Sequence, residues 1–319
     1  MILAGLAALG IGSAFGVSTL ADRREKAAEI DFPPLGKILD VNGVPVHAVV
    51  QGAGPDLVLI HGAGGNLRDF TFSMVGKLAS RYRVIAFDRP GHGYTGRMPG
   101  PFKEGRGESP REQARLLQQA ARQLGASRPL VLGQSFGGAV AMGWALEDPD
   151  MTAGLIVVSG ATMPWPDDLK ATYKVNASPA GAAVVVPVLT ATLTQSFLET
   201  ILTTIFTPDP VPEGYEAHFG LPLSLRRGTM RANARQIVEL KPQVTAMSAD
   251  YGSITAPIAV LHGDLDTIVP LETHAHALMP LLSNAELTEF PGAGHMPHHS
   301  HEAEVIAAID RTAYRAGLR

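Results

Sequence analysis

A serine set between glycines is the first group in this sequence that could perform chemistry. Gly133-Gln134-Ser135-Phe136-Gly137 follows an apolar run that predicts a buried strand and precedes a stretch that predicts a helix. A serine on a sharp strand-to-helix turn needs neighbours without side chains, and Gly133 and Gly137 meet that need. The helix would direct the partial positive charge of its N-terminus at the site. We therefore predict that Ser135 is a nucleophile.

A serine hydroxyl is a poor nucleophile until a base takes its proton. Of the 11 histidines, His295 follows the last predicted strand, and sites in open parallel sheets form at the carboxyl ends of strands. An acid must hold the tautomer of that base, and two aspartates follow the preceding strand. Asp266 is the predicted acid; Asp264 is the alternative and is better suited to support the turn.

The negative oxygen of a tetrahedral intermediate needs two backbone N–H donors. We predict the N–H groups of Phe136, which follows the serine, and of Ala63, which lies in the sequence HGAGG after the third predicted strand. Glycines in that turn let the backbone approach a substrate closely. His61, Gly62 and Gly64 are therefore supporting residues, and His61 is interpreted as a structural hydrogen-bonding group.

Three further histidines follow His295 closely, and such a group could indicate a metal site. His298, His299 and His301 are interpreted instead as surface or helix-start residues, and no metal is expected. The chain has no cysteine, so it can form neither a disulfide nor a thiolate site. Phosphate-loop and dinucleotide fingerprints are absent from the sequence, so no organic cofactor is expected.

Short apolar runs alternate with helical patterns along most of the chain, which predicts a mostly parallel sheet covered on both faces. The Asn42-Gly43 pair predicts a hairpin, and thus antiparallel strands at one edge. The predicted strands are residues 37–41, 45–51, 57–60, 82–87, 129–132, 154–158, 258–261 and 287–290. The predicted helices are residues 70–78, 110–124, 137–146 and 302–316.

This alternation stops between residues 161 and 251, where the apolar stretches have helical length. We predict a helical cap there, inserted into an α/β core formed by residues 30–160 and 252–319. Because the cap is rich in valine, leucine and phenylalanine, it suggests an apolar substrate group. A basic stripe on a later cap helix either faces solvent or attracts a substrate carboxylate. Its members are Arg226, Arg227, Arg231 and Arg235.

Five sequence blocks together resemble the α/β-hydrolase family. They are HGAG at 61–64, DRPGHG at 88–93, the turn at Ser135, GDLD at 263–266 and GH at 294–295, in the order typical of the family. The resemblance covers the chain from about Lys37 onward. It is closest to serine esterases with a helical cap, which are similar to non-haem haloperoxidases and C–C hydrolases. It implies the α/β-hydrolase fold, with 88–93 as a structural loop. Haloalkane dehalogenases and most epoxide hydrolases resemble the pattern but carry aspartate at the turn, so Ser135 argues against both.

The predicted function is hydrolysis of carboxylic esters of small to medium apolar substrates through an acyl-enzyme. Alternatives that would use the same residues are amide, lactone or C–C bond hydrolysis and perhydrolysis. A non-catalytic ligand receptor is a further alternative, against which the complete set of site residues argues. The formal net charge of -4 argues against a nucleic-acid partner.

The N-terminal run from Met1 to Ala21 carries no charged side chain, and a charged linker is predicted from Asp22 to about residue 36. Residues 1–29 therefore form a separate segment, an apolar helix with a charged linker. Its length fits a membrane anchor, and the Arg23-Arg24 pair would leave the catalytic domain in the cytoplasm. The alternatives are a helix docked on the cap or on a second subunit, in a soluble cytoplasmic protein, and a signal peptide of an exported one.

Overall fold

The computed structural model describes residues 2–319, except for the side chains of residues 2–14 and of Glu104. Eight strands form one sheet in the order β1-β2-β4-β3-β5-β6-β7-β8. The strands are β1 Lys37–Val41, β2 Val44–Gln51, β3 Asp56–Ile60, β4 Arg83–Phe87, β5 Leu130–Gln134, β6 Gly154–Val158, β7 Ile258–Gly263 and β8 Ala285–Phe290. All eight predicted strands are present, and their ends lie within two residues of the predicted ones.

The antiparallel part of the sheet is confined to the edge that holds β1 and β2. Strand β1 pairs with β2, and β2 pairs with β4, both antiparallel, whereas β4, β3, β5, β6, β7 and β8 are parallel. The hairpin turn has φ of 54° at Asn42 and 79° at Gly43. Two successive positive φ values characterise the tight turn that an Asn-Gly pair favours. The predicted edge hairpin and mostly parallel sheet are confirmed.

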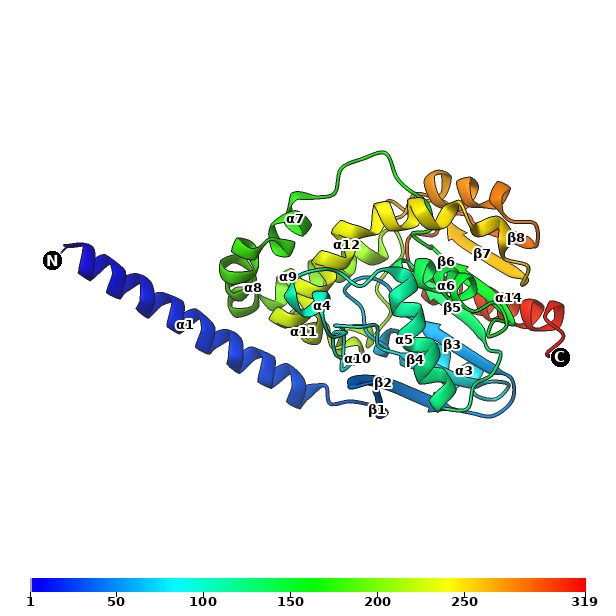
Figure 1. The fold of residues 1–319 in the computed structure, drawn as a ribbon, viewed down its shortest axis with the longest axis horizontal. Helices are drawn as coiled ribbons and strands as arrows, with labels where there is room; N and C mark the ends of the chain where they lie inside the picture. The colour runs from blue at the N-terminus through cyan, green and yellow to red at the C-terminus, as the bar shows by residue number, and fades with distance from the viewer. Residues whose placement is uncertain (1) are drawn as a thin grey trace.

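The central strands are buried on both faces, which explains why they are continuous apolar runs rather than alternating ones. Helices α5 and α6 cover one face, and α3 and α14 cover the other (Figure 1). Their bounds are α3 Met74–Leu78, α5 Pro110–Gln123, α6 Phe136–Glu147 and α14 Glu302–Arg315. The helix predicted over 70–78 is instead two short helices, because the chain leaves helical geometry at Ser73.

The shorter helical segments of the core lie in loops between these elements. They are α2 Arg68–Thr71, α4 Pro101–Glu104, the 3-10 turns Tyr251–Ser253 and Met279–Leu281, the π turn Glu272–His276, and α13 Pro297–Ser300.

The cap lies between β6 and β7 and is helical throughout the described residues 161–251, apart from its loops (Figure 1). Its helices are α7 Ala171–Ala177, α8 Val186–Thr192, preceded by a π turn over Gly181–Val185, α9 Gln195–Phe206, α10 Tyr215–Phe219, α11 Leu221–Ser224 and α12 Arg227–Ser248.

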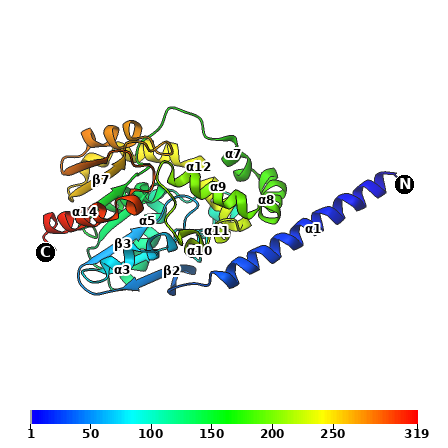
Figure 2. The same ribbon diagram turned by 180° about the vertical axis from the view of Figure 1, so that it is seen from behind.

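Helix α1 runs without interruption from Ile2 to Asp31, so the linker predicted from Asp22 is wrong over its first ten residues. Its second half packs against α8 and α11, and its first half extends away from the body of the molecule (Figures 1 and 2). The charged residues of this second half are not a solvated linker because they meet cations of the cap. Arg227 pairs with Asp22 and Glu25.

The choice among anchor, docked helix and signal peptide depends mainly on the side chains of residues 1–14, which lie outside the described ones. Among the side chains that are described, no single helix has the length and apolar character needed to cross a membrane. The bent pair Ala171–Ala177 and Gly181–Thr192, with 87° between its parts, meets those two criteria only when taken together.

Candidate active site

Ser135 occupies the turn between β5 and α6 in a conformation that side chains rarely adopt, with φ of 54° and ψ of -119°. The turn is fixed by its backbone: Ser135 N–H donates to Val158 O at 2.9 Å, and Ser135 O accepts from Gly138 N–H at 2.9 Å. A side chain at Gly133 would collide with the backbone of Gly137. The glycines are therefore present for the steric reason that the sequence suggested.

His295 and Asp266 meet beyond the carboxyl ends of the parallel strands, where the Ser135 turn also lies. His295 Nδ1 lies 2.7 Å from Asp266 Oδ2, and both side chains are buried. Asp266 Oδ1 also accepts the N–H groups of Ile268 and Val269, each at 2.9 Å. Burial alone would raise the pKa of Asp266, but hydrogen bonds from His262 and His295 outweigh it and lower that pKa well below its usual range. Asp266 is thus an ionised acceptor that orients the imidazole.

Asp264, the alternative acid, is exposed and takes no part in this contact. Its Oδ1 accepts the N–H of Gly292 at 2.7 Å, which joins two loops at the ends of β7 and β8. This contact matches the turn-supporting role considered for Asp264. Of the two aspartates, only Asp266 contacts His295.

Gln134, which sequence analysis did not single out, contacts the His295 segment from inside the serine turn. Its amide nitrogen donates to His295 O at 3.2 Å and lies 3.3 Å from His295 Nε2. With Nδ1–H directed at Asp266, Nε2 carries the free lone pair and can accept a proton. No hydrogen bond joins Ser135 Oγ to His295 among the described side chains, and in unliganded enzymes such bonds are often long until substrate binds. The only sequence signal for Gln134 is its place beside the serine.

The loop after β3 carries Ala63, and both predicted oxyanion donors are available. Within the described residues, neither Ala63 N–H nor Phe136 N–H has a hydrogen-bond partner. The loop itself is held firmly: His61 Nδ1 donates to Gly62 O at 2.8 Å, and Gly64 N–H donates to Asn233 Oδ1 of α12 at 2.8 Å. Backbone donors in a loop held in this way are suited to stabilise developing negative charge.

Arg89 supports this loop from the protein interior and was also missed as a site residue. Its backbone N–H donates to His61 Nε2 at 2.9 Å, and its guanidinium donates to Gly62 O at 3.0 Å. The guanidinium also lies 4.3 Å from the centre of the Phe136 ring. Burial lowers the pKa of Arg89 to about 9. Burial, together with the charge of Arg89, lowers the pKa of His61 to about 4, so His61 is neutral and structural.

His298 and His299 lie at the start of α13, as the helix-start interpretation expected, but they are not surface residues. His298 Nε2 and His299 Nε2 lie 3.0 and 2.8 Å from the two carboxylate oxygens of Asp69. All three side chains are almost fully buried. Only His301 is partly exposed, where it stacks on Phe290. Asp69 precedes His298 by 229 residues, so local sequence patterns do not reveal the contact.

The basic stripe of the cap is likewise not one solvated face. Arg226 donates to Glu29 Oε1 at 2.8 Å and Arg227 to Glu25 Oε1 at 2.9 Å, both on α1. Arg235 is buried instead, with 7% of its surface exposed. Two members of the stripe therefore contact α1, and the sequence interpretation of the stripe as one uniform face is wrong.

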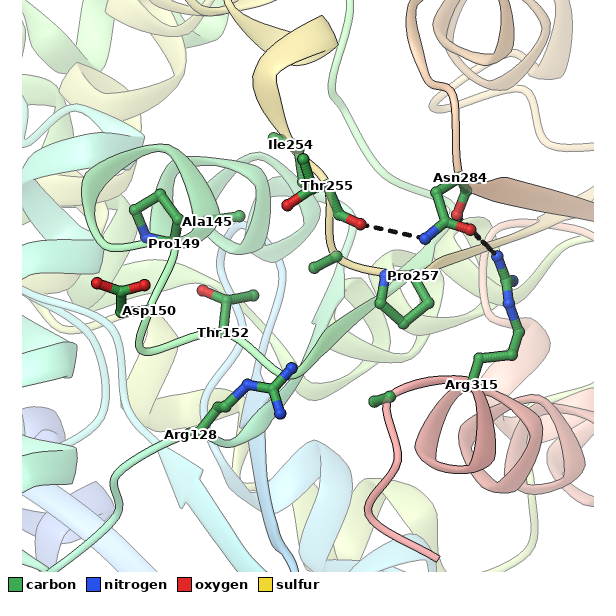
Figure 3. A pocket seen from close by; sticks show the side chains of 12 residues that line it. Arg128, Ala145, Pro149, Asp150, Thr152, Ile254, Thr255, Pro257, Asn284 and Arg315 are labelled. Atoms are coloured by element: carbon green, nitrogen blue, oxygen red, sulfur yellow. Dashed lines mark hydrogen bonds between the residues drawn. The ribbon is translucent and has the colours of Figure 1, made fainter.

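A cavity of about 480 Å³ lies at the amino ends of the parallel strands, on the side of the sheet away from Ser135. Figure 3 shows Arg128, Thr152, Pro257 and Asn284 among its lining residues, each just before one of the strands β5 to β8. Ser135 follows the carboxyl end of β5, whereas this cavity opens at the amino ends. It is therefore separate from the site that contains Ser135, Asp266 and His295.

Comparison with known proteins agrees with this architecture. The model of the Alpha/beta hydrolase family matches residues 57–308. A pimeloyl-[acyl-carrier protein] methyl ester esterase of Chromobacterium violaceum is 30% identical over 280 residues, which cover 81% of this chain and 94% of the relative. Haloalkane dehalogenase 2 of Mycobacterium tuberculosis is 28% identical over 286 residues, 87% of this chain and 94% of the relative. A thermophilic esterase from Thermogutta terrifontis superposes with a TM-score of 0.68 at 22% identity, over 88% of this chain and 97% of the esterase.

The chain therefore belongs to the alpha/beta hydrolase family, and it has the α/β-hydrolase fold. The resemblance inferred from the five sequence blocks is confirmed. Esterase and dehalogenase relatives together make it a hydrolase.

Proposed function

We propose that this protein is a serine carboxylesterase, with Ser135 as nucleophile, His295 as general base and Asp266 as the acid that orients it. The observation that carries the proposal is the 2.7 Å contact between His295 Nδ1 and buried Asp266, at the sheet edge where the strained Ser135 turn lies. A dehalogenase is among the relatives. A dehalogenase-like reaction is nevertheless not favoured, because the residue at the turn between β5 and α6 is Ser135 rather than an aspartate.

In the proposed reaction, Ser135 Oγ attacks the ester carbonyl carbon while its proton moves to His295 Nε2. The carbonyl oxygen becomes negative and accepts hydrogen bonds from the N–H groups of Ala63 and Phe136. The carbon–oxygen bond to the alcohol then breaks, and His295 returns the proton to the leaving alkoxide. Water attacks the acyl-serine by the same sequence, which releases the acid and restores Ser135.

Two features support an apolar ester as the substrate. The cap forms an apolar cluster that reaches the residue after His295, because Met296 packs among side chains of α9 to α11. The 30% identical relative bears the name pimeloyl-[acyl-carrier protein] methyl ester esterase, which supports an ester as the substrate class. Cap residues such as Leu198 and Phe206 mainly pack against one another, so they shape the cap more than they line a pocket.

The test is hydrolysis of p-nitrophenyl esters of increasing acyl length, by the full chain and by the Ser135→Ala variant. We expect turnover by the wild type with a preference for small to medium acyl groups, and a loss on the order of 10⁴-fold in the variant. Release of p-nitrophenol at equal rates by both proteins would contradict the proposal. Turnover of amide, lactone or C–C bond substrates, with esters untouched, would favour the alternative reactions on the same residues.

We also propose that residues 1–21 associate with a membrane. Helix α1 has 30 residues and is therefore about 45 Å long. Among the described side chains of α1, Glu29 and Glu25 tie its second half to the cap through Arg226 and Arg227, and Phe15 is 74% exposed. We expect the full chain to sediment with membranes and a chain that begins at Ile30 to stay in solution. A full chain that stays in solution would contradict the proposal. If the full chain stays in solution, a change of oligomeric state on truncation would favour a docked helix. A mature N-terminus near Asp22 would favour a signal peptide.

A further inference from the structure

The cluster around Asp69 joins three parts of the molecule that are distant in sequence. Asp69 lies on α2, His298 and His299 lie on α13 just after the His295 loop, and Tyr215 begins α10 of the cap. Tyr215 OH donates to Asp69 Oδ1 at 2.7 Å, so the carboxylate has partners in both the core and the cap. Two imidazoles that converge on one buried carboxylate are uncommon without a specific reason.

The three side chains offer ligand atoms in an arrangement that a metal ion can use. One nitrogen of each histidine and one oxygen of Asp69 all lie within 4.8 Å of one another. The two nitrogen–oxygen distances are 3.0 and 2.8 Å. In a tetrahedral site with bonds of about 2.0–2.2 Å, ligand atoms are about 3.4 Å apart. The two nitrogen–oxygen contacts would therefore have to lengthen by roughly half an ångström for these side chains to bind one ion.

We propose that Asp69, His298 and His299 bind one divalent transition-metal ion of the Zn²⁺ class, with the Tyr215 oxygen beside the fourth position. Imidazole and carboxylate are ligands that Zn²⁺ and Co²⁺ accept, whereas soft ions such as Cu(I) prefer sulfur ligands. The ion is structural in this proposal, because it joins α2 to α13, the helix that follows His295. The proposal does not depend on Ser135 being catalytic.

Each histidine contacts Asp69 through Nε2, so that nitrogen carries the hydrogen that is donated to the carboxylate. When the ion binds, this hydrogen must move from Nε2 to Nδ1 or leave the imidazole as a proton. Metal affinity should therefore rise with pH.

The surroundings favour a dry, closed site. His299 packs against the rings of Tyr215 and Phe206, at centroid distances of 4.9 and 5.5 Å, and His298 lies 5.7 Å from Phe70. A low local dielectric strengthens the attraction between a cation and the Asp69 carboxylate. Tyr215 holds the carboxylate in place by donating its hydroxyl hydrogen to Asp69 Oδ1.

The experiment is a Co²⁺ titration of the full chain, prepared without a histidine tag and treated with a chelator beforehand. We expect the visible absorption of tetrahedral Co²⁺ to saturate at one equivalent and to disappear when Zn²⁺ is added. Zn²⁺ should also raise the thermal unfolding midpoint, since a ligand that binds only the folded state stabilises it.

Two shape-preserving variants and one control locate the site. Asp69→Asn and His299→Gln should lower metal affinity by about 100-fold or more. His276→Gln should bind as the wild type does, although His276 lies 2.8 and 2.9 Å from two surface glutamates. Absence of the absorption in the wild type would overturn the proposal, whatever the variants do. An equal signal in wild type, Asp69→Asn and His299→Gln would overturn it too, because the ion would then bind elsewhere.

Discussion

Acid should destabilise this protein through His61, which the fold holds in its neutral form. His61 is fully buried, and both ring nitrogens are used, one by Gly62 O and the other by the N–H of Arg89. Its pKa is lowered to about 4 by burial and by the Arg89 charge, against about 6.5 in an unfolded chain. Between those two values the unfolded state binds a proton that the folded state does not. The free energy of unfolding therefore falls as the pH is lowered through this window.

The size of the effect follows from the difference of about 2.5 pH units, which corresponds to about 3 kcal/mol. That is a large fraction of the total stability of a typical domain. The assay is urea unfolding at about pH 7, 6 and 5, for the wild type and for His61→Gln, whose amide can both donate and accept. The wild type should lose stability steadily below pH 6.5, and the variant should lose less over the same range. Part of the dependence should stay in the variant, because burial also lowers the pKa values of His92, His274 and His298. An identical pH dependence in both proteins would refute the reasoning, because His61 would then not be the group that takes up the proton.

Three further perturbations test the site and the contact with α1. Ser135→Ala should remove turnover by about 10⁴-fold with an unchanged unfolding midpoint, and a variant that keeps a tenth of the activity would rule out Ser135 as nucleophile. Asp266→Asn should lower kcat strongly, because an asparagine amide favours the wrong tautomer of His295. Asp264→Asn should lower mainly stability. If parallel kinetic and thermal assays showed the reverse, Asp264 would be the acid. Arg227→Ala should cost about 1 kcal/mol and release α1 faster in limited trypsin digestion, and unchanged cleavage would mean that its ion pairs do not hold the helix.

The sheet could be predicted from the sequence because its signals are local. A strand buried on both faces must be a short apolar run, and residues 154–158 show this pattern with the same bounds in the structure. The Ser135 turn was equally visible, since the glycines required by its geometry are adjacent in sequence. The sequence places both Asp264 and Asp266 after the strand that precedes the last one, and it favours Asp266. Only the fold shows that Asp266 is the carboxylate that contacts His295.

What the sequence could not reveal depends on partners far along the chain. Asp22 and Glu25 have the composition of a solvated linker, and they continue a helix because Arg227, about 200 residues away, pairs with them. His298 does lie at the start of a helix, but its contact with buried Asp69 comes from a residue 229 positions earlier in the chain. In each case a charged or polar side chain was assigned to solvent, because no periodic pattern records a single long-range pair.

Helix α12 connects the two regions whose roles were hardest to predict. Its first residue, Arg227, pairs with α1, and Asn233, less than two turns later, accepts the N–H of Gly64 in the loop that carries Ala63. One turn on, Gln236 accepts from the buried Arg89 guanidinium at 3.0 Å. Helix α12 therefore contacts both α1 and the loop that carries Ala63, at positions less than two turns apart along the same helix. These contacts explain why the N-terminal helix and the loop after β3, which are far apart in sequence, are both tied to the cap.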